Sequence, residues 1–400
     1  MTYPDRLLLL MVGVGMTLTA CGGEPPADSD MPPARAVASE TETAPPLPRT
    51  VLETGSEYQP LAVVQIAALE NPWAVAFLPD GRYLVTERGG RLLRVTAEGG
   101  LTAISGVPEV AVRNQGGLLD VVLHPDFDNN QWVYLTYSLG DRQETTTALA
   151  RGRLEGDALV DVEVLFEQDR RSEPGRHYGS KLAWMSDGTL LMSIGDRGAQ
   201  PPRAQDPMDH AGSLLRLTED GGVPTDNPFA DGRDALPEIY STGHRNIQGL
   251  VVVPGSDAIW VTEHGPRGGD ELNLVRPGQN YGWPRAGKGR DYRTEEMYGE
   301  ARSIEGLVDP VYEFLPTLAP SGLAVVTSDR FPRWQGNLLA GGLRAERIAR
   351  LVIENDEVVH EESLLLQAIG RIRDVREGPD GHIYVVTDEQ EGGLFRIQPN

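Results

Sequence analysis

The sequence predicts an all-β fold, a six-bladed β-propeller of four-stranded antiparallel blades, over residues 56–400. The main observation is a unit of turn and short strand that recurs six times, at a spacing of about 50 to 60 residues that suits one blade. The second observation is composition, because 46 glycines and 30 prolines among 400 residues favour many turns and short strands over long helices.

The repeated unit is a Pro-Asp-Gly-like turn followed by a strand of alternating apolar residues. Asp-Gly turns between runs of β-branched residues are typical of β-hairpins. A β-sandwich or two small β-domains is the alternative that these hairpins leave open. Four clear copies and two looser ones occupy residues 78–87, 186–195, 253–263, 378–388, 124–137 and 331–340.

The first 55 residues are predicted to lie outside the propeller. Residues 7–19 are almost wholly apolar and have the length of a signal-peptide core, which is too short to span a bilayer comfortably. They lead to Leu18-Thr19-Ala20-Cys21, which resembles a bacterial lipobox. We therefore expect a lipoprotein signal peptide over residues 1–20 and lipidation at Cys21, with an ordinary signal peptide and a chance cysteine as the alternative.

Residues 21–55 are rich in Pro, Ala and Glu and poor in large apolar residues, so we expect a disordered tether. These features predict an exported protein, held on a bacterial membrane by its lipid and facing the periplasm. Gly22 after the cysteine favours the outer membrane. The formal net charge of −23 repels phosphate backbones and argues against a nucleic-acid partner.

Candidate functional residues gather in loops where polar side chains stand beside glycines, which let a backbone approach a ligand closely. A propeller brings such loops together around its central channel. Four segments fit this description, namely residues 114–120, 177–182, 243–250 and 263–273, the last of them followed by residues 280–284.

With these segments and residues 370–375, the chain resembles the soluble PQQ-dependent glucose and aldose sugar dehydrogenases, from roughly Leu61 to the C-terminus. The resemblance implies oxidation of aldose sugars at the anomeric carbon to lactones, by hydride transfer to PQQ with the help of calcium. It also implies a separate electron acceptor, a quinone or a cytochrome. A single cysteine in the sequence leaves no haem-attachment motif in this chain.

PQQ is a planar ortho-quinone with three carboxylates, so guanidinium groups are suitable partners for it. Neutral amides and a tyrosine would complete the hydrogen bonds to the cofactor. The resemblance assigns PQQ binding to Gln115, Arg245, Asn246, Tyr292, Arg344, Arg371 and Arg373.

The resemblance makes His177 the general base that removes the proton from the anomeric hydroxyl. Histidine suits this role because its ordinary pKa lies near neutral pH. We expect structural roles for two other histidines, with His124 in a turn and His244 bracing the Arg245 loop.

Calcium prefers carboxylate and carbonyl oxygens, and it would polarise a quinone oxygen as a Lewis acid. The resemblance places one calcium on the carbonyls of Gly265 and Pro266, beside PQQ. It places a second, structural calcium on Glu271 and the Tyr281 carbonyl. Alternatively, Asp270 and Glu271 form an ordinary solvated acidic pair.

Three positions depart from the family pattern: Arg344 stands where lysine is common, Ile247 replaces a proline, and Lys181 replaces an arginine. A calcium-dependent lactonase and a non-catalytic sugar-binding propeller are the competing functions. The arginine set argues against the lactonase, and His177 argues against the non-catalytic protein. The compact loops favour broad aldose specificity over a narrow preference for glucose.

Overall fold

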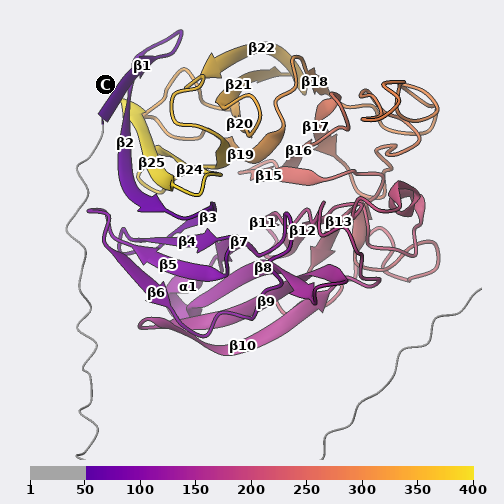
Figure 1. Cartoon of the computed structure of the whole chain (residues 1–400), viewed down its shortest axis with the longest axis horizontal. Coiled ribbons are helices and arrows are strands. Elements are labelled where there is room, and N and C mark those ends of the chain that lie inside the picture. Colours follow the sequence, from indigo (N-terminus) through magenta and orange to yellow (C-terminus); the bar gives the residue numbers. More distant parts are fainter. Residues whose placement is uncertain (1–50) are drawn as a thin grey trace, which may run out of the picture. The chain divides into compact units, whose positions relative to one another are not determined.

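The structure is a computed structural model that describes residues 51–400, and these residues form six antiparallel β-sheets (Figure 1). The predicted six-bladed propeller is confirmed. Blade 1 contains β3 (Pro72–Phe77), β4 (Tyr83–Glu87), β5 (Arg91–Val95) and β6 (Leu101–Ile104). Blade 2 contains β7 (Leu118–Leu123), β8 (Trp132–Gly140), β9 (Thr145–Glu155) and β10 (Ala158–Glu167). Blade 3 contains β11 (Leu182–Trp184), β12 (Leu190–Ile194), β13 (Ser213–Leu217) and β14 (Ile239–Ser241).

Blades 4 and 5 follow the same order from the innermost to the outermost strand. Blade 4 contains β15 (Ile247–Val253), β16 (Ala258–Glu263), β17 (Asp270–Val275) and β18 (Tyr312–Phe314). Blade 5 contains β19 (Pro320–Val325), β20 (Leu338–Gly342), β21 (Arg347–Glu354) and β22 (Glu357–Leu364). Helix within the described residues is confined to α1 (Phe127–Asn130) and the 3-10 helix η1 (Pro201–Gln205).

The sixth blade joins strands from both ends of the described chain. Its order is β23 (Ile372–Glu377), β24 (Ile383–Thr387), β25 (Gly392–Pro399), β2 (Pro60–Leu69) and β1 (Val51–Gly55). Figure 1 shows β2 in indigo alongside β25 in yellow. This pairing closes the ring with ladder hydrogen bonds between segments more than 300 residues apart.

Strand β1 changes one predicted boundary, because residues 51–55 were expected to belong to the tether. The structure pairs Val51–Gly55 with residues 60–64 of β2, so ordered structure begins before residue 56. The predicted signal peptide, Cys21 and the rest of the tether lie outside the described residues. No helix in residues 51–400 is long and apolar enough to cross a membrane.

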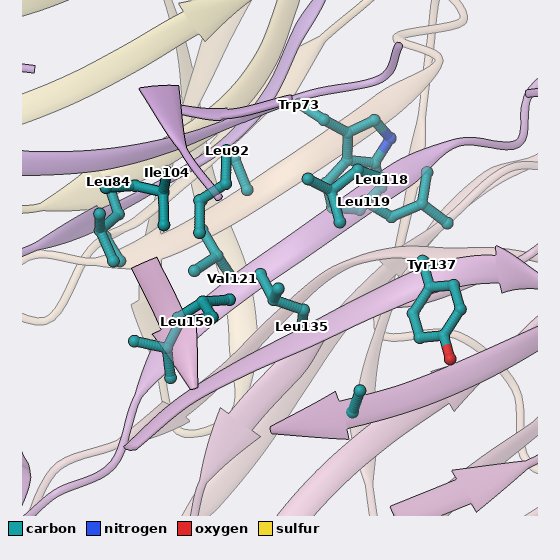
Figure 2. Close-up of a cluster of buried hydrophobic side chains, with 14 of the residues drawn as sticks. Trp73, Leu84, Leu92, Ile104, Leu118, Leu119, Val121, Leu135, Tyr137 and Leu159 are labelled. Atoms are coloured by element: carbon teal, nitrogen blue, oxygen red, sulfur yellow. The ribbon is translucent and has the colours of Figure 1, made fainter. Parts of the chain in front are cut away.

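The core consists of six clusters of buried side chains, one at each interface between neighbouring blades. Figure 2 shows the cluster between blades 1 and 2, where Leu84, Leu92 and Ile104 gather above Val121, Leu135 and Leu159, and Leu118 lies near Trp73. The innermost strands also contact one another in a closed ring, in the order β3, β7, β11, β15, β19 and β23. Each blade is therefore fixed by both of its neighbours.

Antiparallel blades divide the connections between two faces. Connections from first to second and from third to fourth strand lie on one face, which we call the turn face. Connections from second to third strand, and from each blade to the next, lie on the opposite face, which we call the cavity face. The six turns found in the sequence all join a first strand to a second, whereas the four candidate segments begin in connections of the cavity face.

One long insertion also reaches the cavity face. It joins β17 to β18 over residues 276–311, and its first part runs beside the residues that follow β14. The Tyr281 and Trp283 amides donate to the carbonyls of Thr242 and Gly243, at 2.9 Å each. This carries the Trp283 indole to the loops that precede β15 and follow β12.

Candidate active site

A cavity of about 340 Å³ opens on the cavity face, and all six blades contribute to its wall. Four of the predicted cofactor residues line it, and these are Gln115, Asn246, Arg371 and Arg373. A volume of this size is within the range of small-molecule sites in proteins. The topology thus brings together polar residues from all four predicted segments and from residues 371–373 at the start of β23.

The cations of this cavity outnumber its anions. Asp388 accepts hydrogen bonds from the Nη2 atoms of Arg371 and Arg373, at 2.8 and 2.9 Å. Burial alone would raise the pKa of Asp388, but these two guanidinium groups lower it to about 2. The Nε atom of Arg373, which lines this cavity, is buried without a hydrogen-bond partner in residues 51–400, and so is that of Arg245, which lines the smaller cavity described below.

Arg245, Arg344 and Tyr292 do not line this cavity. Arg245 donates from Nη1 to the His264 carbonyl at 3.2 Å and lies over the Trp283 ring. Arg344 is exposed, follows cavity-lining Leu343, and has no hydrogen-bond or ion-pair partner in the described part of the chain. The exposed Tyr292 hydroxyl donates to the Pro266 carbonyl at 2.8 Å, one of the predicted calcium ligands.

His177 is buried and directly precedes Tyr178 and Gly179, which line the cavity. Its amide donates to Gln115 Oε1 at 2.9 Å, and its Nδ1 lies 2.6 Å from Asp196 Oδ1. Trp283 Nε1 donates to the other carboxylate oxygen of Asp196 at 2.7 Å. Because an ionised carboxylate only accepts, this geometry places the imidazole proton on Nδ1 and leaves Nε2 as a free acceptor.

The electrostatic surroundings keep this histidine neutral. Burial is the main cause that lowers the pKa of His177, and the nearby Arg245 lowers it further, against the opposing effect of Asp196. Burial acts to raise the pKa of Asp196, but its hydrogen bond to His177 and the charge of Arg245 hold it below its ordinary value. The pair is therefore a neutral imidazole beside a carboxylate, the state that a proton acceptor requires.

Sequence reasoning missed Asp196 and the adjacent Arg197, although the signal was present. Both lie between Gly195 and Gly198 in the connection after β12, so they meet the same criterion of polar residues beside glycines. Arg88 and Asp388 also line the cavity and follow second strands in the same way. The criterion was sound, but it was applied to too few of the connections.

A second, much smaller cavity of about 20 Å³ lies beside the first. Its wall includes all four predicted metal ligands, Gly265, Pro266, Glu271 and Tyr281. A space of this size holds one water molecule or one ion. Asp270 is buried and accepts hydrogen bonds from the amides of Gly265 and Ala319, at 3.0 and 2.7 Å. The alternative of a solvated acidic pair is therefore wrong, because Asp270 holds this loop in place.

The small cavity brings two carboxyl groups, those of Glu263 and Glu271, close together. Burial raises the pKa of Glu271 to about 8, and the neighbouring Glu263 carboxylate adds to the rise. Glu263 accepts hydrogen bonds from His244 Nδ1 at 2.9 Å and from the Arg245 amide at 2.7 Å. These contacts confirm that His244 braces the Arg245 loop. Two carboxylates facing carbonyl groups form an oxygen-rich site that suits a hard cation.

Two of the three departures from the family pattern have structural consequences. Lys181 is buried in the wall of a separate cavity on the turn face, described below, and its Nζ donates to Asp374 at 2.7 Å. Ile247 is buried at the start of β15 in the core between blades 3 and 4. His124 lies in the turn between β7 and β8 and pairs with Glu219 at 2.7 Å, which confirms its structural role.

A third cavity, of about 370 Å³, opens on the turn face, between strand ends that include those of β15 and β19. Asp374 in its wall accepts from both Lys181 and Arg376, at 2.7 and 2.8 Å, and Glu377 accepts from the amide and the hydroxyl of Thr327, at 2.7 and 2.6 Å. The cavity on the cavity face instead combines unpaired donors with a neutral histidine. It is therefore the candidate active site.

The fold and this site define a six-bladed propeller with an arginine-lined cavity close to a buried, neutral histidine. The family model described as Glucose / Sorbosone dehydrogenase matches residues 69–396. The aldose sugar dehydrogenase YliI of Escherichia coli is 43% identical over 83% of this chain and 91% of its own length. An uncharacterized protein of Synechocystis is 43% identical over 98% of both chains.

Solved structures agree with this family. The soluble aldose sugar dehydrogenase from Escherichia coli in its apo form has a TM-score of 0.82 and 40% identity, covering 85% of this chain and 100% of that one. The PQQ-bound aldose sugar dehydrogenase from Streptomyces coelicolor has a TM-score of 0.70 and 27% identity, covering 89% and 100%. The chain belongs to the glucose/sorbosone dehydrogenase family and is an oxidoreductase that acts on sugars.

Proposed function

We propose that this protein oxidises aldose sugars at the anomeric carbon to lactones, with PQQ as the hydride acceptor, calcium as a second cofactor and His177 as the general base. The observation that carries the proposal is the neutral His177 held by Asp196 close to a cation-lined cavity. A dehydrogenase of this type needs a proton acceptor and a site for an anionic cofactor side by side.

The residues present fit PQQ. Its three carboxylates need donors, and the site offers Arg371, the unpaired Nε atoms of Arg245 and Arg373, and the unpaired Arg344 at the rim. Two relatives support a quinone cofactor, since the Streptomyces coelicolor enzyme was solved in its PQQ-bound form and the Acinetobacter calcoaceticus glucose dehydrogenase B is named a quinoprotein. The latter is 27% identical over 81% of this chain.

The chain's own residues would orient the sugar and move one proton. When bound, PQQ supplies the oxidising power by accepting a hydride from the anomeric carbon. His177 Nε2 takes the proton of the anomeric hydroxyl as that carbon becomes the lactone carbonyl. Asp196 holds the imidazole on its Nδ1 side and stabilises the imidazolium that forms.

The residues of the small cavity fit calcium. Glu271, the Gly265, Pro266 and Tyr281 carbonyls, and the adjacent Glu263 would supply oxygen ligands. The raised pKa of Glu271 indicates a carboxylate that lacks a counter-charge, which a divalent cation would provide. When bound near the quinone, calcium supplies Lewis-acid polarisation. Because this cavity has room for one ion, we propose that it takes the structural calcium on Glu271 and the Tyr281 carbonyl, and that the calcium beside PQQ binds the Gly265 and Pro266 carbonyls outside it.

We also propose that the protein is exported and anchored through lipidated Cys21 to a bacterial membrane, facing the periplasm. The proposal rests on the sequence Leu18-Thr19-Ala20-Cys21 after an apolar segment. Electrons would pass from the site to a separate acceptor, a quinone or a cytochrome. Cell fractionation with and without Cys21→Ser checks the anchor, because unchanged membrane association in the variant would overturn it.

The function is tested by dye reduction with a panel of aldoses on residues 51–400. We expect turnover with PQQ and calcium together, and no turnover with calcium alone or with neither. His177→Ala is the matched control, which should bind PQQ normally yet lose turnover. Hydrolysis of lactones in the absence of PQQ would favour the lactonase instead. Sugar binding without any turnover would favour the non-catalytic propeller.

A further inference from the structure

Arg197 is an arginine buried without a counter-ion. Its side chain is fully buried, and it forms no ion pair with any carboxylate in residues 51–400. Arg350, which is equally buried, is neutralised by Glu362 and Glu57 at 2.6 and 3.1 Å. Burying an uncompensated charge is costly, and burial lowers the pKa of Arg197. Other contacts must therefore account for its position.

Those contacts lie on either side of His177. Arg197 Nη1 donates to the carbonyl oxygen of Arg176 at 2.8 Å, and its guanidinium carbon lies 3.7 Å from the centre of the Tyr178 ring. The Tyr178 hydroxyl lies 2.7 Å from Thr145 Oγ1, and Arg197 Nη2 lies 3.4 Å from that same oxygen. One planar group thus holds the residues immediately before and after His177.

His177 needs such support because its backbone is in the left-handed region, with φ of 53°. Residues other than glycine adopt this conformation at a cost of about 1 kcal/mol or more, and they keep it when the surroundings fix it. Without support, the loop would relax and turn the imidazole away from Asp196. Asp196 directly precedes Arg197 in the connection after β12. This one segment therefore holds the side chain of His177 through Asp196 and the backbone around His177 through Arg197.

We propose that Arg197 is a positioning residue, which clamps the Arg176 carbonyl and the Tyr178 ring so that His177 Nε2 faces the cavity. The inference rests on the proposed function, because it takes His177 as the proton acceptor. Arg197 would act without contacting substrate or cofactor, through the backbone conformation of its neighbour. The cation–π contact explains why a guanidinium is used here, because it can stack and donate hydrogen bonds at the same time.

The test compares Arg197→Gln and Arg197→Lys with Arg350→Met, which also removes a buried arginine but lies in β21 of blade 5. We expect Arg197→Gln to lower kcat at least tenfold, while KM and PQQ affinity change by less than about twofold. Arg197→Lys keeps the charge but loses the planar fork, so its kcat should lie between those of Arg197→Gln and the wild type. Arg350→Met should lower the unfolding temperature and leave kcat near the wild-type value.

A second readout uses the apoprotein. Nitrogen-15 NMR of labelled histidines should show the His177 Nδ1 proton, protected by its bond to Asp196, in the wild type and in Arg350→Met. In Arg197→Gln this signal should broaden or shift. A folded Arg197→Gln with wild-type kcat and an unchanged signal would overturn the inference, and so would failure of both Arg197 variants to fold.

The two proposals fail in different ways. Full turnover in His177→Ala would remove the proposed general base, whatever the Arg197 variants do. Loss of turnover in His177→Ala together with full turnover in Arg197→Gln would leave the general base intact and reject the positioning role alone.

Discussion

At the scale of single residues, the site depends on how His177 is held. Three contacts fix it, since Gln115 binds its amide, Asp196 binds its Nδ1, and Arg197 holds its neighbours. Asp196 is itself fixed by the Trp283 indole and by the Gly198 amide, each at 2.7 Å. These two contacts keep the Asp196 carboxylate oriented toward His177.

Replacing Asp196 with asparagine should test this arrangement. In Asp196→Asn one of the two donors, His177 Nδ1 or Trp283 Nε1, must face the new amide NH₂ group. The imidazole would then lose its fixed tautomer, and we expect kcat to fall by about 10² to 10⁴. Steady-state kinetics with PQQ and calcium measure this. Asp206→Asn, a half-buried position in the same connection, serves as control, and unchanged kcat in Asp196→Asn would contradict the assigned role.

The sequence predicted much of this site at the level of residue types. Polar residues beside glycines pointed to Gln115, His177 and Asn246, and the structure brings these together. It did not indicate that Tyr292 and Arg344 stay exposed, because side-chain direction in a long loop depends on contacts that no local pattern encodes. Asp196 meets the same criterion, since it stands between Gly195 and Gly198, but its pairing with His177 joins two separate connections and no local pattern encodes it.

At the scale of strands, a repeated hydrogen bond joins blade to blade. In blade 2, Thr136 Oγ1 accepts from the Asp120 amide at 2.9 Å, where β7 bulges, and donates to the Ser180 carbonyl of the blade 3 loop at 2.8 Å. In blade 1, Thr86 bridges the Ala74 amide and the Leu119 carbonyl in the same way. A hydroxyl on the second strand thus accepts a hydrogen bond from the first-strand amide at the bulge and donates one to a carbonyl at the start of the next blade.

Removing one such hydroxyl should cost stability. Thr136→Val keeps the shape and leaves the Asp120 amide and the Ser180 carbonyl unsatisfied in a buried site. We expect the free energy of unfolding to fall by about 1–3 kcal/mol. Chemical denaturation measures this. Thr102→Val on the outer strand β6, where the hydroxyl makes no side-chain hydrogen bond in the described residues, should change it by less than about 0.5 kcal/mol.

The hairpin turns were the elements that the sequence revealed best. Asp-Gly turns encode their own conformation locally, and all six lie where a first strand meets a second. The outer strands β14 and β18 have only three residues each, and β1 was assigned to the tether. Such strands form because the edge of a neighbouring strand provides hydrogen-bond partners. Their own residues therefore predict a strand only weakly.

At the scale of the whole molecule, stability is linked to pH through two carboxyl groups of blade 4, Glu263 and Glu271, which lie opposite each other on β16 and β17. Glu271 has a pKa of about 8 in the folded chain, above its ordinary value of 4.5. Between these values the folded chain retains a proton that the unfolded chain releases. The contribution of Glu271 therefore lowers the free energy of unfolding as pH rises through this window, by at most about 1.4 kcal/mol per pH unit.

Calcium should counteract this loss. We expect calcium to raise the unfolding temperature more at pH 8 than at pH 5, because the ion replaces the proton on Glu271. Scanning calorimetry with calcium and with a chelator measures this. Glu271→Gln should remove most of both the pH effect and the calcium effect, whereas Glu98→Gln on the surface should keep both. A calcium response that survives in Glu271→Gln would place the ion elsewhere.

The separation of the two faces has a practical consequence for attaching this enzyme to a sensor electrode. The Gly81, Gly188 and Gly255 turns on the turn face have nothing within 4 Å of an added Cβ. The one cysteine of the sequence, Cys21, lies before the described residues. A thiol introduced next to one of these turns in residues 51–400 would thus be a unique coupling point. If every molecule were immobilised through this thiol, the cavity face would point to the solution and the turn face to the electrode.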